Sequence, residues 1–254
     1  MRWAAAAILL AGLALGTMAC GGGDNRRARD KPRLVVSAAA SMKEALEKCS
    51  PEFAAADVRL SFAGSDELAA QIRRGVKPDV YSAANTELPA RLRREGLLEQ
   101  PVKLVTNRLV VAVPRDSEIG PVEDLARPGS KLALGSESVP IGAYTRKLLS
   151  RLPARMARAI LANVRSNEPD VRGIVGKLTQ GAADAGFAYE SDVRAARGKL
   201  RSVALPGRLQ PSVVYAAGVV KDAPHPRAAR RYLHDLAAGR CHTTLLSAGF
   251  GPTP

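Results

Sequence analysis

Aromatic residues make up only 4% of the 254-residue chain, which contains one Trp, three His and three Cys. There is no DNA-binding motif and no run of basic residues interleaved with stacking aromatics, so nucleic acid is not an expected partner. The histidines show no i, i+4 pairing with carboxylates, which argues against a metal site built from protein side chains. These histidines are His225, His234 and His242.

The hydrophobic content predicts a folded protein, and the net charge predicts a basic one. Hydrophobic residues account for 46% of the chain, which at this length predicts one large or two modest α/β domains. The net charge of +14 comes from Lys and Arg scattered through predicted amphipathic helices. This pattern is typical of a solvated basic surface, and mild steering of anions or adhesion to an anionic membrane is the alternative.

The N-terminus predicts export. After Arg2, residues 4–16 form an apolar run with the length of a secretory signal, too short for a spanning helix. The following Thr17-Met18-Ala19-Cys20 resembles a bacterial lipobox, so residues 1–20 are expected to be a signal peptide and Cys20 a lipidation site. Ordinary cleavage next to Ala19 is the alternative. Residues 21–32 would then be a flexible tether to the outer face of the membrane.

Two cysteines remain once Cys20 is set aside. Cys49 lies at the end of the first predicted helix of the mature chain and Cys241 at the start of the last one. In an oxidising compartment such a pair favours a disulfide that joins the two ends of the chain, with two independent buried thiols as the alternative.

Predicted strands alternate with predicted helices along most of the chain, which indicates parallel sheets with helices on both faces. Strands are expected at residues 33–38, 58–62, 80–84, 108–113, 131–134, 185–189 and 213–220. Helices are expected at residues 42–49, 67–74, 87–95, 142–152 and 171–179, and a helical segment at 227–247. A Pro/Gly-rich stretch in the middle suggests a second sheet, and residues 107–113 and 212–220 are candidate strands that cross between two domains.

Short turns before predicted helices carry most of the candidate binding groups. Ser41 follows a strand and forms an S-x-x-E capping-box pattern with Glu44, and Gly64-Ser65 repeats the arrangement after the next strand. Helix N-termini offer free N–H groups and a positive dipole end, which suit an anion. Three further candidates are Ile141 after Pro140, Val171 after Asp170, and Tyr189 at the end of a strand. Each of these turns is ordinary on its own, and capping alone would explain any one of them.

Seven segments, taken together in order, resemble periplasmic molybdate-binding proteins of ABC transporters. They are VVSAAASMKEAL, LSFAGSDELAAQI, PDVYSAAN, NRLVVAVP, SVPIGAYTRKLL, EPDVRGIVGKLTQGAADAGFAYESD and SAGFGP. The resemblance implies a type II periplasmic-binding-protein fold, with two α/β lobes, each a mostly parallel sheet flanked by helices, and two hinge strands. The lobes are expected at residues 33–107 with 216–254, and at residues 108–215.

The resemblance also implies an oxyanion in the cleft, held by donors from both lobes. Ser41 and Ser65 would supply hydroxyl and N–H groups, Ile141 and Val171 backbone N–H groups, and Tyr189 its phenol. A fully deprotonated oxyanion only accepts hydrogen bonds, so a site made of donors suits it. Asp66 stands where the family commonly has Gly, and we expect it to cap its helix and face solvent.

The expected function is capture of molybdate or tungstate and delivery to an ABC importer, with another tetrahedral oxyanion such as sulfate or phosphate as the alternative. An enzyme is not expected, because no nucleophile, base and orienting group occur together. The expected partners are the anion, a transporter permease and, through the lipid, the membrane. The chain is expected to be a monomer without a cofactor.

Overall fold

The computed structural model describes residues 31–254. The predicted signal peptide, Cys20 and nearly all of the predicted tether lie outside the described residues. Among residues 31–254, no helix is long and apolar enough to cross a membrane.

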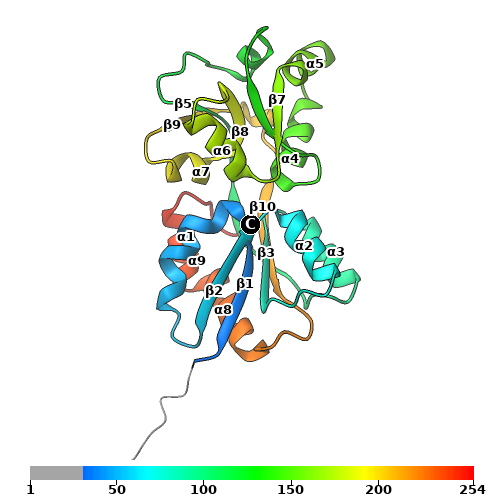
Figure 1. The fold of residues 1–254 in the computed structure, drawn as a ribbon, viewed down its shortest axis with the longest axis vertical. Helices are drawn as coiled ribbons and strands as arrows, with labels where there is room; N and C mark the ends of the chain where they lie inside the picture. The colour runs from blue at the N-terminus through cyan, green and yellow to red at the C-terminus, as the bar shows by residue number, and fades with distance from the viewer. Residues whose placement is uncertain (1–30) are drawn as a thin grey trace, which may run out of the picture. The chain divides into compact units, whose positions relative to one another are not determined.

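Two five-stranded sheets form the framework (Figure 1). The first has the order β2 (Asp57–Ala63), β1 (Arg33–Ala39), β3 (Val80–Ala83), β10 (Val213–Val219) and β4 (Val102–Asn107). The second has the order β7 (Val164–Glu168), β6 (Leu132–Gly135), β8 (Ala185–Tyr189), β5 (Leu109–Pro114) and β9 (Leu200–Ala204).

One strand in each sheet runs against the other four. β10 is antiparallel to both β3 and β4, and β5 is antiparallel to both β8 and β9. Each reversed strand follows a passage of the chain from one sheet to the other: β4 leads through Arg108 into β5, and β9 leads into β10. The structure therefore has the two mostly parallel α/β lobes that the sequence predicted. The predicted lobe boundary after residue 215 falls inside β10, which pairs with β4 from Val213 onward.

Helices cover both sheets (Figure 1). The first lobe, meaning the first sheet with its helices, contains α1 (Lys43–Cys49), α2 (Ser65–Arg73), α3 (Glu87–Arg94), α8 (Pro226–Ala238) and α9 (Arg240–Ser247). The second lobe contains α4 (Pro140–Leu149), α5 (Ala154–Ala162), α6 (Val171–Thr179) and α7 (Glu190–Ala195).

Alternating side chains explain how helices pack on both faces of the first sheet. In β3, Tyr81 and Ala83 join a cluster with Leu68 of α2 and Leu92 of α3, whereas Val80 joins the larger core on the other face. The central strands β5 and β8 of the second sheet are apolar and almost wholly buried, as expected for strands covered on both faces.

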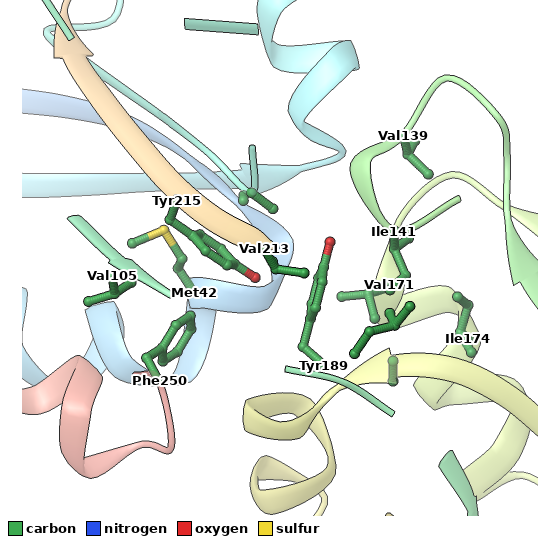
Figure 2. Packing of buried hydrophobic residues seen from close by; sticks show 14 of the residues in the cluster. Met42, Val105, Val139, Ile141, Val171, Ile174, Tyr189, Val213, Tyr215 and Phe250 are labelled. Atoms are coloured by element: carbon green, nitrogen blue, oxygen red, sulfur yellow. The ribbon is translucent and has the colours of Figure 1, made fainter. Parts of the chain in front are cut away.

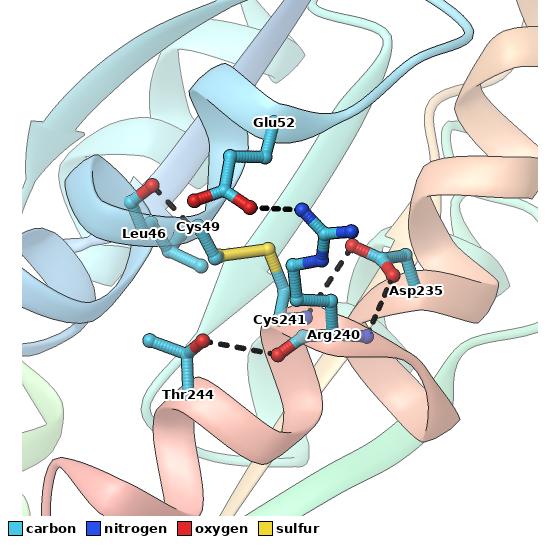
Figure 3. A network of polar contacts seen from close by, with 7 residues as sticks. All are labelled: Leu46, Cys49, Glu52, Asp235, Arg240, Cys241 and Thr244. Atoms are coloured by element: carbon cyan, nitrogen blue, oxygen red, sulfur yellow. Dashed lines mark hydrogen bonds and ion pairs between the residues drawn. A yellow bond between two sulfur atoms is a disulfide. The ribbon is translucent and has the colours of Figure 1, made fainter.

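The C-terminal helical segment, expected at residues 227–247, is interrupted. It consists of α8 and α9, separated at Gly239, and the Asp235 carboxylate accepts hydrogen bonds from the N–H groups of Arg240 and Cys241 at the start of α9. Cys241 forms a disulfide with Cys49, and Arg240 forms an ion pair with Glu52 beside it (Figure 3). The bridge joins the first and last helices of the described chain, so it cross-links the two ends within the first lobe.

Candidate functional site

A small cavity lies where the two lobes meet, and all five residues proposed from the sequence line it: Ser41, Ser65, Ile141, Val171 and Tyr189. The first lobe contributes segments that follow β1, β2 and β3, and the second lobe contributes the starts of α4 and α6 and the end of β8. Its volume is about 20 Å³, on a scale where one water needs about 10 to 15 Å³. A ligand of very few heavy atoms suits this space, and sugars or peptides do not.

Ser41 lies in a short 3₁₀ turn, η1 (Ala40–Met42), between β1 and α1. The predicted capping box with Glu44 is absent, because the side chains have other partners. The Ser41 hydroxyl lies 2.7 Å from the Tyr215 hydroxyl, and Glu44 forms an ion pair with Arg172 of the second lobe. The Ser41 side chain is therefore not engaged in holding the helix start.

Ser65 is the first residue of α2, two residues before the predicted start, and it is buried. Its hydroxyl oxygen accepts a hydrogen bond of 3.1 Å from the N–H of Ala84, and its carbonyl accepts one of 2.7 Å from the Tyr81 hydroxyl. The hydroxyl proton takes no part in the bond to Ala84, so it remains available for the cavity. These two bonds fix the turn against β3.

Asp66 differs from the expectation that it would cap α2 and face solvent. No side chain caps this helix, and the Oδ1 atom of Asp66 is buried without a hydrogen-bond partner among the described residues. The cap position belongs to Gly64, which has no side chain to offer, and Asp66 lies two residues beyond it, inside the helix. Asp66 does not line the cavity.

The second lobe presents two helix starts. α4 begins with Pro140, and α6 begins with Val171 after Asp170, whose carboxylate accepts from the N–H groups of Arg172 and Gly173. That cap leaves the first N–H group of α6 free. Within residues 31–254, the backbone N–H groups of Ile141 and Val171 donate to no protein acceptor.

Tyr189 ends β8, and its side chain is 1% exposed. Its hydroxyl is buried without a hydrogen-bond partner among the described residues. Burial raises the pKa of this phenol well above 10, with smaller contributions from Tyr215, Tyr144 and Asp192, so the group keeps its proton and can donate it. Figure 2 shows the Tyr189 ring rising from β8 with its oxygen toward the side where Ile141 lies. A buried phenol without a partner is costly unless something else accepts from it.

The two lobes lie close together at Gly64. A Cβ atom placed on this residue would lie 2.6 Å from the carbonyl oxygen of Pro169 and 3.4 Å from a methyl group of Val139, both in the second lobe. The φ angle of Gly64 is −56°, which any residue adopts. The added atom would also lie 2.9 Å from the Asp66 carboxylate, so glycine is required here by its close neighbours, chiefly the Pro169 carbonyl, rather than by the backbone conformation.

Donors dominate the electrostatics of the cavity. Among the residues that the structure describes, no Lys or Arg lines it, and the one carboxylate in its lining, Asp170, already accepts two hydrogen bonds. The described residues contain no group of three or more His, Cys, Asp or Glu side chains able to hold a metal ion. The arrangement suits a small anion that accepts hydrogen bonds through its own oxygens.

Two features of the site have no counterpart in the sequence-based prediction. One is Tyr215, the single aromatic residue in the apolar strand β10, and the other is the Glu44–Arg172 ion pair between the lobes. A lone Tyr in an otherwise apolar strand is a signal that could have been read, whereas the ion pair joins residues 128 positions apart.

Fold and site together define a protein that binds a small solute between two lobes, and the chain belongs to the family of bacterial extracellular solute-binding proteins, whose pattern matches residues 34–251. It is 31% identical to the molybdate-binding protein ModA of Mycobacterium tuberculosis, covering 98% of this chain and 99% of that one. The family works outside the cytoplasm, and this chain shares that location.

Solved structures agree on the fold. The periplasmic molybdate-binding protein of Azotobacter vinelandii superimposes with a TM-score of 0.77 at 18% identity, covering 87% of this chain and all (100%) of that one. The sulfate-binding protein SubI of Mycobacterium tuberculosis gives the same TM-score of 0.77 at 17% identity, covering 87% of each chain. Overall fold therefore does not distinguish the two anions.

Proposed function

We propose that this protein captures molybdate or tungstate between its lobes and delivers the anion to an ABC importer. The observation that carries the proposal is a set of donors that line one cavity and have no acceptor within residues 31–254: the Tyr189 hydroxyl, the Ser65 hydroxyl proton and the N–H groups of Ile141 and Val171. The identity with the mycobacterial molybdate-binding protein supports the choice of anion.

Hydrogen bonds to a charged ligand supply the binding energy in this site. A hydrogen bond to a charged group contributes about 1.5 to 3 kcal/mol, so the five donors together can offset an association cost in the lower and middle part of the roughly 4 to 15 kcal/mol range. Each donor is already in place and buried, which reduces the reorganisation that binding requires. A binding role without Lys or Arg in the cavity is therefore consistent with high affinity.

Calorimetric titration of the purified protein with molybdate, tungstate, sulfate and phosphate tests the proposal. We expect tight binding of molybdate and tungstate and much weaker binding of the other two. Tight binding of sulfate without molybdate would replace the proposed ligand, and binding of none of the four would overturn the function.

The proposal also covers membrane attachment, oligomeric state and the transport partner. We propose that Cys20 carries a lipid anchor, that the chain is a monomer, and that a permease receives the anion. Membrane release by Cys20→Ala, the mass of the purified protein in solution, and stimulation of a reconstituted transporter test these three points separately. Retention of the variant at the membrane would argue against the lipid.

A further inference from the structure

Tyr215 lies behind the cavity rather than in its lining. It belongs to β10, is fully buried, and its ring packs edge-to-face against Tyr189 at 5.9 Å and Phe250 at 5.2 Å between centroids (Figure 2). Its hydroxyl lies 2.7 Å from that of Ser41, which does line the cavity. Tyr215 therefore touches one anion donor from each lobe.

Only one of the two hydroxyl groups, Ser41 or Tyr215, donates its proton in the hydrogen bond between them. If Tyr215 donates, the Ser41 proton is free for the cavity, whereas if Ser41 donates, the Tyr215 proton needs another acceptor. Within residues 31–254, the Tyr215 hydroxyl forms one short hydrogen bond, to Ser41, and the Asn107 side chain lies close to it. The direction of the bond is therefore decided by what else surrounds Tyr215.

The surroundings of Tyr215 offer donors and rings. Burial raises the pKa of this phenol well above its ordinary value, and the nearby Asp192 raises it further, so the phenol keeps its proton. The side-chain oxygen of Asn107 already accepts from the N–H of Arg108, and its amide nitrogen donates to Ser191. Tyr215 thus keeps its proton and has one acceptor for it, Ser41.

We propose that Tyr215 is a positioning and selectivity residue, which donates to Ser41 and so makes the Ser41 hydroxyl a committed donor toward the cavity. The proposal rests on the proposed function. When an unprotonated oxyanion binds, Tyr215 donates a hydrogen bond to Ser41 and Ser41 donates one to the anion. Each hydrogen bond polarises the next. A protonated oxyanion that donates to Ser41 reverses the chain and leaves the Tyr215 proton buried without an acceptor, which is unfavourable. Tyr215 would thereby disfavour hydrogen phosphate without touching it.

Titration of Tyr215→Phe, Ser41→Ala and the double variant with molybdate and phosphate tests this inference. We expect Tyr215→Phe to weaken molybdate binding roughly tenfold, to leave phosphate binding unchanged or stronger, and to have less than about a twofold effect in the Ser41→Ala background. Equal loss for both anions, or the same loss in both backgrounds, would overturn the role. Failure of the wild type to bind molybdate would instead contradict the proposed function.

The chain offers a matched control. Tyr232 is also buried, and its hydroxyl lies 2.6 Å from that of Ser50, in the first lobe but outside the cavity lining. Tyr232→Phe removes the same kind of bond, so it should change the melting temperature without changing affinity. If Tyr215→Phe does not fold, 3-fluorotyrosine at position 215 retains the ring and is a stronger donor. We then expect molybdate affinity at or above that of the wild type, and weaker binding would overturn the proposal.

Discussion

The two lobes share a sheet topology but supply different kinds of donor. In each sheet the reversed strand is the fourth in spatial order and enters from the other lobe. The first lobe brings the hydroxyl groups of Ser41 and Ser65 to the cavity, whereas the second brings the N–H groups of Ile141 and Val171 and the Tyr189 phenol.

This difference determines how each half of the site can be altered. A hydroxyl donor disappears when Ser is replaced by Ala, but a backbone donor survives every substitution except proline. The contribution of the first lobe should therefore depend on side-chain identity, whereas the second lobe should depend on backbone chemistry at Ile141 and Val171 and on a side chain only at Tyr189. The following predictions test that contrast on affinity for molybdate.

Removing both serine hydroxyls should have the largest effect. Two hydrogen bonds to a charged ligand are lost in Ser41→Ala with Ser65→Ala, so we expect affinity to fall at least about 100-fold. Calorimetric titration measures the loss. Because these hydroxyls also bond to Tyr215 and to the N–H of Ala84, the melting temperature of the ligand-free protein should fall modestly.

Ser50→Ala provides the control for that stability cost, since it breaks the Ser50–Tyr232 bond away from the cavity. It should lower the melting temperature by a similar amount for each bond lost and leave affinity unchanged. A large loss of stability in the double variant with little loss of affinity would show that these serines serve only the fold.

Val171→Pro should show how much a backbone N–H group of the second lobe contributes to molybdate affinity. Val171 is the first residue of α6, where proline is tolerated, and Asp170 before it is extended, as a residue preceding proline must be. The substitution removes one N–H group, so we expect a loss of roughly 10- to 100-fold in affinity with α6 intact.

Val171→Ala is the matched variant, because it trims the side chain and keeps the N–H group. We expect Val171→Ala to bind within about threefold of the wild type, since the contribution assigned to this residue is its N–H group. Equal losses in both variants would assign the contribution to side-chain packing instead.

Gly64 tests whether the lobes must come this close for tight binding. Gly64→Ala places a methyl group against the Pro169 carbonyl across the cavity, and overpacking of this kind costs about 1 to 3 kcal/mol. We expect roughly 5- to 100-fold weaker binding by titration, with little change in the melting temperature of the ligand-free protein. Gly176→Ala, where the added methyl group meets nothing within 4 Å, should leave affinity unchanged. Wild-type affinity in Gly64→Ala would mean that closure of the lobes tolerates the extra atom.

Sequence patterns predicted the two-lobe α/β fold because the buried strands are apolar and bounded by turns, as in β5 and β8. They missed β7, an edge strand with the sequence VRSNE and no apolar run, and they missed β4, β9, α5 and α7. They also joined α8 and α9 into one segment, because the break depends on the Asp235 side chain bonding to the start of α9.

The sequence indicated candidate residues where a donor follows a recognisable turn. It did not predict contacts between residues that are far apart in the sequence. Ser65 and Val171 follow Gly64 and Asp170, which mark helix starts in the sequence. The predicted partner of Ser41 was the nearby Glu44, whereas the structure pairs it with Tyr215, 174 positions away. Local patterns show where a donor lies, but its proton direction depends on contacts that form only in the folded chain.

The smallest effect concerns the contact outside the cavity. The Glu44–Arg172 ion pair joins α1 of the first lobe to α6 of the second, and its side chains are 44% and 43% exposed. Exposed pairs contribute about 0.2 to 1 kcal/mol, and salt screens them. Arg172→Gln should therefore weaken molybdate binding about two- to fivefold at low ionic strength, through faster dissociation measured by stopped flow, and scarcely at all in high salt.

Lys199→Gln separates the ion pair from simple loss of positive charge. Lys199 shares a surface hollow with Glu44 and Arg172 and forms no ion pair among the described residues. If the pair holds the lobes together, Lys199→Gln should leave the dissociation rate unchanged, because it removes the same charge without breaking a contact between the lobes. If both variants accelerate dissociation equally, the general positive charge of the second lobe, and not the ion pair, slows the release of the anion. The donors inside the cavity would then be the only groups that hold the two lobes together around the ligand.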